Sequence, residues 1–231
     1  MLEVRNQKVG ECKMKISSLK SVRLIHFFLL ISFVVVFIWS AFKPYQLGTW
    51  FLEVTPIVLG TIIIIYNYNK FRLTTPVYLL LCLGAIIVLI GGHYTYGKVP
   101  LFNWLQDSFH LGRNYYDRFG HFVNGFVWAL TLREILLRTS PVQKGKLLIT
   151  IVLGLVLGIS AFYELVEWCV AIMLGGDAEA FLGLQGDIWD THWDMFLALA
   201  GAIVCLLSLS STHNRFLVKE TGVKQRSLTP S

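Results

Sequence analysis

Charged residues are scarce in this sequence. Asp, Glu, Lys and Arg together make up 15% of its 231 residues, against about 25% in an ordinary soluble domain. Hydrophobic residues reach 55%. The shortage of charge excludes an ordinary soluble domain, because such a domain needs a polar surface, and it indicates a membrane protein.

Cysteine is also rare, and its copies show no paired spacing. Three of the four lie in apolar runs, where a free thiol behaves as a small hydrophobic side chain. The pattern therefore gives no support to a disulfide framework or a zinc knuckle. The four positions are Cys12, Cys82, Cys169 and Cys205.

The motifs of several well-known enzyme classes are missing. There is no HExxH pair, GxSxG turn, Walker phosphate loop or Rossmann glycine fingerprint. No internal repeat is visible, so an inverted-repeat transporter has no support. In a membrane protein, the net charge of +6 indicates cytoplasmic loops beside anionic lipid. We therefore expect the lipid bilayer as a partner and no nucleic acid, while protein partners and oligomeric state cannot be read from the sequence.

Long apolar runs are what the sequence does contain. A helix needs about 20 such residues to cross the hydrocarbon layer of a membrane, and six runs approach this length. We predict an all-α, polytopic transmembrane bundle with a basic N-terminal segment (1–23), one transmembrane domain (24–209) and a polar tail (210–231). The predicted spans are residues 24–42, 50–66, 76–92, 119–137, 147–174 and 192–209.

The distribution of Lys and Arg predicts the orientation of the bundle. With both termini in the cytoplasm, 16 of the 20 Lys and Arg residues lie on the inner side and 4 on the outer side. Lys and Arg accumulate on the cytoplasmic side of membrane proteins, so this orientation is strongly favoured over its inverse. The loops at about 93–118 and 175–191 are then expected outside.

Two carboxylates interrupt the fifth apolar run. Glu164 and Glu167 follow seventeen uncharged residues and are three positions apart, so they share one face of a helix. An ionisable group near the centre of a bilayer costs about 2.5–3.5 kcal/mol, and it indicates a functional site by default. The same run contains Gly154 and Gly158, whose GxxxG spacing predicts close packing against another helix.

More polar residues lie at the predicted outer ends of the fourth and sixth spans. Asp117 and His121 are four apart, and Asn124 continues their stripe one turn deeper. With the predicted topology, three segments bring carboxylates and an imidazole to a similar depth. Three carboxylates lie at the outer mouth of the sixth span, at a spacing that puts them on one helical stripe if the helix begins early: Asp187, Asp190 and Asp194.

These residue types suit a metal-dependent site. Carboxylate oxygens and imidazole nitrogens are ligands for Mn²⁺, Fe²⁺, Zn²⁺ or Mg²⁺, and a bound divalent metal ion can activate water. The predicted metal ligands are Asp117, His121, Glu164, Asp187 and Asp194. The predicted catalytic residues are Glu164, Glu167, His121 and Asp190. The predicted substrate-binding residues are Arg118, Asn124 and Trp168, with the Arg118 guanidinium suited to a phosphate or carboxylate.

Simpler structural roles stay open for these residues. Asp190 suits the N-cap of the sixth helix, Asp117 suits a cap or an arginine pair, and Glu164 suits a buried ion pair with Arg118. Three functions also stay open: an enzyme acting at the outer leaflet, a cation or proton transporter, and a non-catalytic scaffold. The enzyme ranks above the transporter because the inner halves of the spans offer few polar groups for a pathway.

Three blocks of sequence resemble a known family. Residues 116–122, 163–168 and 185–195 read YDRFGHF, YELVEW and QGDIWDTHWDM, and they are similar to the signature blocks of the YjdF-like family. This resemblance implies a polytopic protein of the bacterial cytoplasmic membrane, and it brings no activity, since the family is a domain of unknown function. Residues 117–122 are also similar to a block of VanZ-like membrane proteins, which points towards cell-envelope or lipid-headgroup functions.

Overall fold

Helices are the only regular elements in the part of the chain that this computed structural model describes, residues 2–174 and 185–222. The predicted all-α class is confirmed for that part. Residues 175–184 of a predicted outer loop and residues 223–231 of the predicted tail lie outside it. In chain order the elements are α1 (Leu2–Ala41), α2 (Leu47–Asn67), α3 (Thr75–Tyr94), α4 (Pro100–Phe109), α5 (Tyr116–Thr139), α6 (Lys146–Leu174), α8 (Asp190–Phe216) and the π-helix η2 (Leu217–Thr221).

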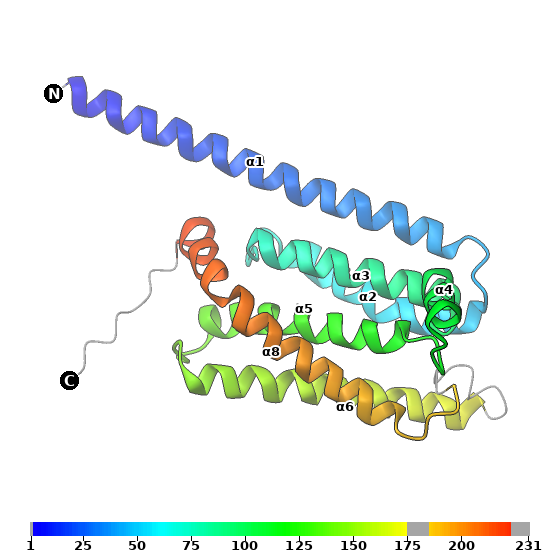
Figure 1. The fold of residues 1–231 in the computed structure, drawn as a ribbon. Coiled ribbons are helices and arrows are strands. Elements are labelled where there is room, and N and C mark those ends of the chain that lie inside the picture. Colours follow the sequence, from blue (N-terminus) through cyan, green and yellow to red (C-terminus); the bar gives the residue numbers. More distant parts are fainter. Residues whose placement is uncertain (1, 175–184, 223–231) are drawn as a thin grey trace.

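The long helices lie side by side in an elongated bundle (Figure 1). Helix α1 begins and helix α8 finishes at the same end of this bundle, which we call the η2 end. The short helix α4, the connection between α1 and α2, and the first turns of α5 and α8 lie at the opposite end, which we call the α4 end. The three segments with unusual polar residues therefore meet at the α4 end.

Five of the described helices are long and apolar enough to cross a membrane. The predicted fourth span corresponds to α5, whose 24 residues are enough to cross a membrane but include Asp117, Arg118, Arg133 and Glu134. These charges lower its mean hydropathy, yet α5 runs through the middle of the bundle (Figure 1), where neighbouring helices cover it. The five apolar segments are Lys20–Ala41, Leu47–Asn67, Thr75–Tyr94, Lys146–Met173 and Asp190–Thr221.

Helix α4 lies inside the region that the sequence predicts to be a loop. It begins at Pro100, a residue that suits the first position of a helix, and its ten residues are too few to cross a membrane. None of its residues is buried, and Leu101, Trp104 and Phe109 are each at least 60% exposed. A search for membrane-length runs misses such a short helix.

Two glycines bring α5 and α8 into close backbone contact. A Cβ atom at Gly125 of α5 would overlap the backbone carbonyl of Ala198 on α8. A Cβ atom at Gly201 of α8 would overlap the carbonyl oxygen of Phe122 on α5. This close approach is reciprocal, and it sets the distance between the two helices that carry the acidic residues of the α4 end.

Adding one methyl group at this contact should destabilise the bundle. We expect Gly201→Ala to lower the free energy of unfolding by about 1–3 kcal/mol, because the two backbones must separate to admit the new Cβ. The measurement is the thermal unfolding midpoint of the detergent-purified protein. The matched control is Gly158→Ala on α6, where a Cβ would meet no described atom within 4 Å. Equal midpoints for the two variants would contradict the close α5–α8 contact.

No helix of the described chain makes the predicted GxxxG contact on the fifth span. Cβ atoms built at Gly154 and Gly158 meet nothing within 4 Å among the described residues. The side of α6 that carries them is not covered by another described helix. The spacing alone is common by chance, and the glycines that do admit a neighbouring helix, Gly125 and Gly201, lie on different helices.

A polar network at the η2 end joins α3, α5 and α8. The Glu134 carboxylate is fully buried and accepts hydrogen bonds from the backbone and hydroxyl of Thr74, at 2.9 Å and 2.6 Å, and from Arg138 at 2.6 Å. His213 Nε2 lies 2.9 Å from the same carboxylate, and Arg133 lies 2.8 Å from His213 Nδ1. Helix α8 therefore continues past residue 209, where the sequence predicts the tail to begin, because His213 belongs to this network.

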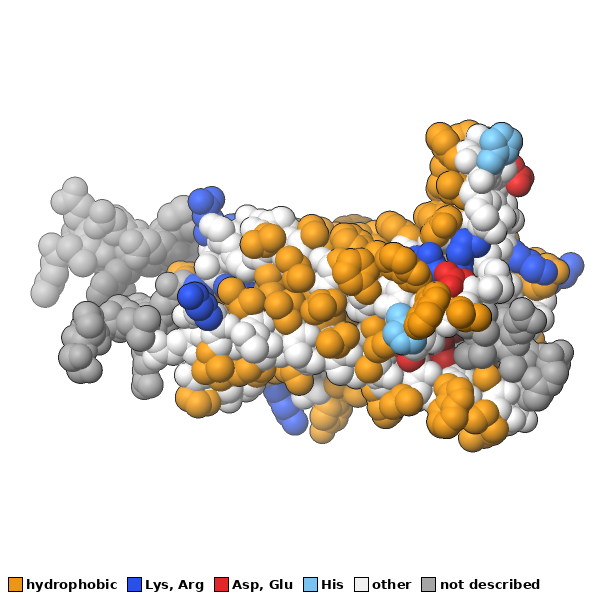
Figure 2. Space-filling view, turned by 60° about the horizontal axis from the view of Figure 1, so that its bottom comes forward, with side chains coloured by type: hydrophobic (Ala, Val, Ile, Leu, Met, Phe, Trp, Pro, Cys, Tyr) orange, Lys and Arg blue, Asp and Glu red, His pale blue; other side chains and the backbone are white. Residues whose placement is uncertain are grey.

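The surface of the bundle is divided into zones. Hydrophobic side chains cover the middle of the face shown in Figure 2, whereas basic side chains lie at the η2 end. Acidic, basic and histidine side chains gather near the α4 end of the same face (Figure 2). A wide apolar middle between two polar ends is the surface expected of a protein whose middle lies in hydrocarbon.

Candidate metal centre

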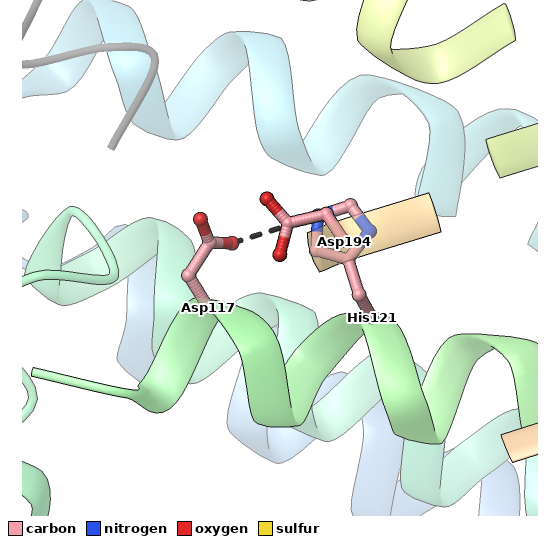
Figure 3. A group of neighbouring side chains, drawn as sticks. All are labelled: Asp117, His121 and Asp194. Carbon is pink, nitrogen blue, oxygen red and sulfur yellow. Dashed lines mark ion pairs between the residues drawn. The ribbon is translucent and has the colours of Figure 1, made fainter. Parts of the chain in front are cut away.

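The first turns of α5 and α8 bring three candidate metal ligands together. One ligand atom from each of Asp117, His121 and Asp194 lies within 4.8 Å of the other two. Asp117 and His121 are one turn apart on α5, and Asp194 points towards them from α8 (Figure 3). His121 Nε2 lies 3.7 Å from Asp117 Oδ1. The sequence predicts all three as ligands, and the structure brings these three together.

Glu164 of α6 lies beside this group. Its Oε1 is 3.8 Å from His121 Nε2, and its side chain is 7% exposed. Within the described part of the chain, neither Glu164 Oε1 nor Asp194 Oδ1 accepts a hydrogen bond, although both atoms are buried. Buried carboxylate oxygens are normally paired or bound to a metal, so these two atoms indicate a missing partner.

Two arginines form a separate layer nearer the end of the bundle. Arg113 makes a two-pronged ion pair with buried Asp190, and one of its N···O distances is 3.0 Å. Arg118 pairs with Asp187 and lies 3.3 Å from Asp190. Asp187 and Asp190, predicted as a ligand and a catalytic residue, are therefore engaged by arginines. The alternative pairing of Glu164 with Arg118 is not found among the described ion pairs.

The electrostatics outside the helices agree with this pairing. The backbone N–H of Trp189 and the Arg118 guanidinium hold the pKa of Asp187 below its ordinary value. Burial acts to lower the pKa of Arg113, but the hydrogen bonds and charge of Asp190 outweigh it and raise that pKa. The carboxylates of Asp187 and Asp190 are thus paired with the two arginines.

A cavity of about 350 Å³ opens beside the candidate ligands. Asp117 and His121 line it from α5, Glu167 lines it from α6 and Glu53 lines it from α2. Asn124 also lines the cavity, so three of the predicted catalytic or binding residues, His121, Asn124 and Glu167, face this space. Its size falls in the range of small-molecule sites, about 300–1,000 Å³.

Glu53 lines the cavity and is not among the residues that the sequence patterns predicted for the site. Its buried carboxylate accepts hydrogen bonds from the Tyr163 hydroxyl at 2.7 Å and from the Tyr96 hydroxyl at 3.0 Å. Burial raises the pKa of Tyr96 well above its ordinary value, and the nearby Glu53 charge adds to this effect, so Tyr96 remains a hydrogen-bond donor. The sequence feature that could have indicated this role is a carboxylate inside the apolar run 50–66.

Trp168, predicted to bind substrate, does not line the cavity. Its side chain is 58% exposed, and the cavity is lined by its neighbour Glu167. Successive residues of a helix are turned by about 100°, so the residue after a cavity-facing glutamate points elsewhere. Arg118, also predicted to bind substrate, stacks at 5.3 Å over the rings of Tyr115 and Trp193.

The cavity is rich in carboxyl groups. Five carboxylates surround it and the candidate ligands, and within the described residues none of them forms an ion pair with Lys or Arg. His121 is the basic group beside them. An uncompensated group of buried carboxylates favours a bound cation over an anion. The five are Glu53, Asp117, Glu164, Glu167 and Asp194.

Comparison with known proteins identifies a family and a relative. The family described as predicted membrane protein (DUF2238) matches residues 25–215. The inner membrane protein YjdF of Escherichia coli (strain K12) is 42% identical over 182 residues, which cover 79% of this chain and 87% of YjdF. No solved structure matches. The resemblance to the YjdF-like family is thus confirmed, while the similarity to VanZ-like proteins stays a prediction.

Proposed function

The chain belongs to the DUF2238 family of predicted membrane proteins, and from that premise we propose that it is a metal-dependent enzyme. Its substrate class is a lipid or an envelope precursor, and its site is the group Asp117, His121 and Asp194 with Glu164 beside them. We place it in the bacterial inner membrane, as the name of its E. coli relative suggests.

The proposed topology has six spans: the five apolar helices and α5, which is the fourth span in chain order. Since α1 begins and α8 finishes at the same end of the bundle (Figure 1), an even number of crossings is the natural count. Most Lys and Arg residues belong to the segments at the η2 end, and this excess favours a cytoplasmic location for that end. The metal centre then lies at the outer side of the membrane.

A single observation carries the proposal of a metal centre. Three ligand atoms of suitable type lie within 4.8 Å of one another, and two buried carboxylate oxygens at the same place, on Glu164 and Asp194, have no described hydrogen-bond partner. Three protein ligands leave coordination positions for water and substrate, as in catalytic zinc sites. Two carboxylates and one imidazole suit Mn²⁺, Fe²⁺ or Zn²⁺.

The residues around this site suit hydrolysis or group transfer. A divalent ion held by Asp117, His121 and Asp194 would supply a water of lowered pKa and would polarise the bond under attack. Glu164 lies beside the proposed ligands with a free carboxylate oxygen, and so it suits the general base that takes the proton from that water. Glu167 and Asn124 line the cavity where the substrate's polar part would lie.

Transport ranks below catalysis because the polar site does not continue through the bundle. Between His121 and the network around Glu134, helix α5 buries the apolar side chains of Val127, Ala129 and Leu130. Val156 of α6 is buried at the same core. A pathway for ions or protons needs polar groups or water through the whole depth of the membrane.

Metal content tests the proposal. We expect the detergent-purified protein to contain about one transition-metal ion per chain by elemental mass spectrometry, and Asp194→Asn to lose most of it. The matched control is Asp107→Asn on exposed helix α4, which should keep the parent's content. A parent without metal, or an Asp194→Asn variant with full content, would overturn the assignment and favour a structural scaffold.

A further inference from the structure

A groove separates α1 from α2 over the middle of the bundle. Both helices pack on α3, and they touch each other at their connected ends, where Trp50 of α2 donates a hydrogen bond of 3.1 Å to the hydroxyl of Ser40. Towards the η2 end, His26 of α1 bridges to the Tyr68 hydroxyl at 2.8 Å and to Thr75 at 3.0 Å. The space between these two contacts is a cavity of about 550 Å³.

The walls of this groove are almost entirely apolar. Helix α1 contributes Phe27, Leu30 and Phe33, and Phe27 is 57% exposed at the edge. The polar lining residues, including His26 and Arg23, are concentrated towards the η2 end. Further apolar walls come from α2, α3 and α5, namely Ile57, Ile64, Ile65, Leu81, Ala85 and Trp128.

The groove and the acidic cavity are adjacent to each other. Pro56, Ile57 and Trp128 line both of them. The acidic cavity then leads on to Asp117 and His121. A molecule that occupies both spaces must be apolar along the groove and polar at the end that reaches the candidate ligands.

The shape of the groove favours a hydrocarbon chain over a protein helix. One turn of helix, 10–12 Å across and 5.4 Å high, fills roughly 400–600 Å³, so the groove has room for about one turn. The contacts at Trp50 and His26 close both ends, which prevents a longer helix from lying between α1 and α2. A flexible chain entering sideways from the hydrocarbon layer meets neither restriction.

We propose that the groove between α1 and α2 holds the hydrocarbon chain of a membrane lipid, whose polar end lies in the acidic cavity beside Asp117 and His121. This assignment rests on the proposed function for its chemistry, because it names the substrate class of that site. The occupant of the groove can nevertheless be tested without any activity assay.

Photo-crosslinking tests the groove directly. The probe is a phosphatidylethanolamine with a diazirine on one acyl chain, placed with the full-length protein in nanodiscs of phosphatidylethanolamine and phosphatidylglycerol. Leu81 and Ala85 of α3 form the floor of the groove and are partly buried, whereas Trp128 is 38% exposed, so the readout is crosslinked peptides containing Leu81 or Ala85. We expect floor labelling in the parent, and we expect unlabelled phosphatidylethanolamine to compete with it.

Two variants fill the groove, and one control does not. Gly60→Trp places an indole from α2 into the groove, where a Cβ meets no described atom within 4 Å, and Ala85→Phe fills it from α3. The control Gly154→Trp adds the same side chain at an equally open position of α6, which lines neither cavity. Folding of each variant is checked by size-exclusion profile and thermal midpoint.

The outcomes separate this proposal from the proposed function. Loss of floor labelling in Gly60→Trp or Ala85→Phe, with labelling kept in Gly154→Trp and metal content unchanged in all three, supports the hydrocarbon-chain site. Floor labelling that is absent in the parent, or that persists in both filling variants, overturns it. Floor labelling in a parent that contains no metal overturns the proposed function and leaves chain binding in place.

Discussion

Glu134→Ala is expected to lower the free energy of unfolding by about 3–5 kcal/mol, which is the cost of removing one partner from a buried ion pair. Glu134 is fully buried at the η2 end, and its carboxylate accepts bonds from Thr74, Arg138 and His213. Alanine would leave the buried Thr74 hydroxyl without its carboxylate acceptor, and among the described residues the guanidinium of Arg138 would keep only the Arg72 carbonyl as an acceptor, at 2.7 Å. Buried polar groups that lose their partners carry the full cost of desolvation.

The expected loss corresponds to a fall of roughly 6–20 °C in the unfolding midpoint of a chain of this size. The measurement is thermal unfolding of the purified protein in detergent, followed by circular dichroism. The control is Asp107→Ala, which removes an exposed carboxylate from α4 and should change the stability by less than about 0.5 kcal/mol. Equal midpoints for the two variants would show that the network around Glu134 contributes little stability.

His121→Ala is expected to weaken metal binding by at least roughly 100-fold. Removing a group that merely supports a ligand costs about 10–100-fold in affinity, and His121 is proposed as a ligand itself. The imidazole is the one nitrogen ligand of the group, and its Nε2 lies within 4 Å of both Asp117 and Glu164. Without the imidazole only carboxylate ligands remain, and these bind transition metals less tightly than a site with both oxygen and nitrogen ligands.

Titration of the metal-free protein with Zn²⁺ or Mn²⁺ measures this change. His192→Ala is the matched control, because His192 is an exposed histidine in the first turn of α8 at the same end of the bundle. We expect the control to bind with the parent's affinity. If both histidine variants bind alike, His121 is not a ligand, and its position beside Asp117 is structural.

Hydrophobic run lengths predicted most of the fold. The apolar segments of α1, α2, α3, α6 and α8 correspond to predicted spans because a membrane helix must be apolar over about 20 residues. Helix α5 is different, because it buries Arg133 and Glu134 against other helices and so has a lower mean hydropathy. The extension of α8 to His213 depends on a partner on α5, which no local pattern reveals.

The candidate ligands could be predicted only as a larger set. Spacing predicted that Asp117 shares a face with His121, and that Asp187, Asp190 and Asp194 share another if the helix begins early. Helix α8 begins at Asp190, so Asp187 lies before it and is not on that face. Which of these carboxylates meets Arg113 and which meets His121 depends on how α5 and α8 are rotated about their axes, and this rotation is set by the contacts of Gly125 and Gly201. The spacing of residues in the sequence does not predict how the two helices are rotated.

Glu53 also shows that sequence spacing does not predict how the helices pack. Its hydrogen-bond donors, Tyr96 and Tyr163, are 43 and 110 residues away along the chain. The carboxylate in an apolar run is visible in the sequence, but its place beside Asp117 and Glu167 follows only from the packing of α2 against the cavity. The position of Glu53 in the site therefore depends on long-range packing, which the periodicity of the sequence does not reveal.

X-ray absorption spectroscopy of the metal-containing parent protein tests the central claim most directly. If Asp117, His121 and Asp194 bind the ion, the spectrum will show one imidazole nitrogen together with oxygen ligands, at about 2.0–2.2 Å for zinc. A first shell without imidazole, or one dominated by sulfur at about 2.3 Å, would contradict the claim and move the metal to other residues.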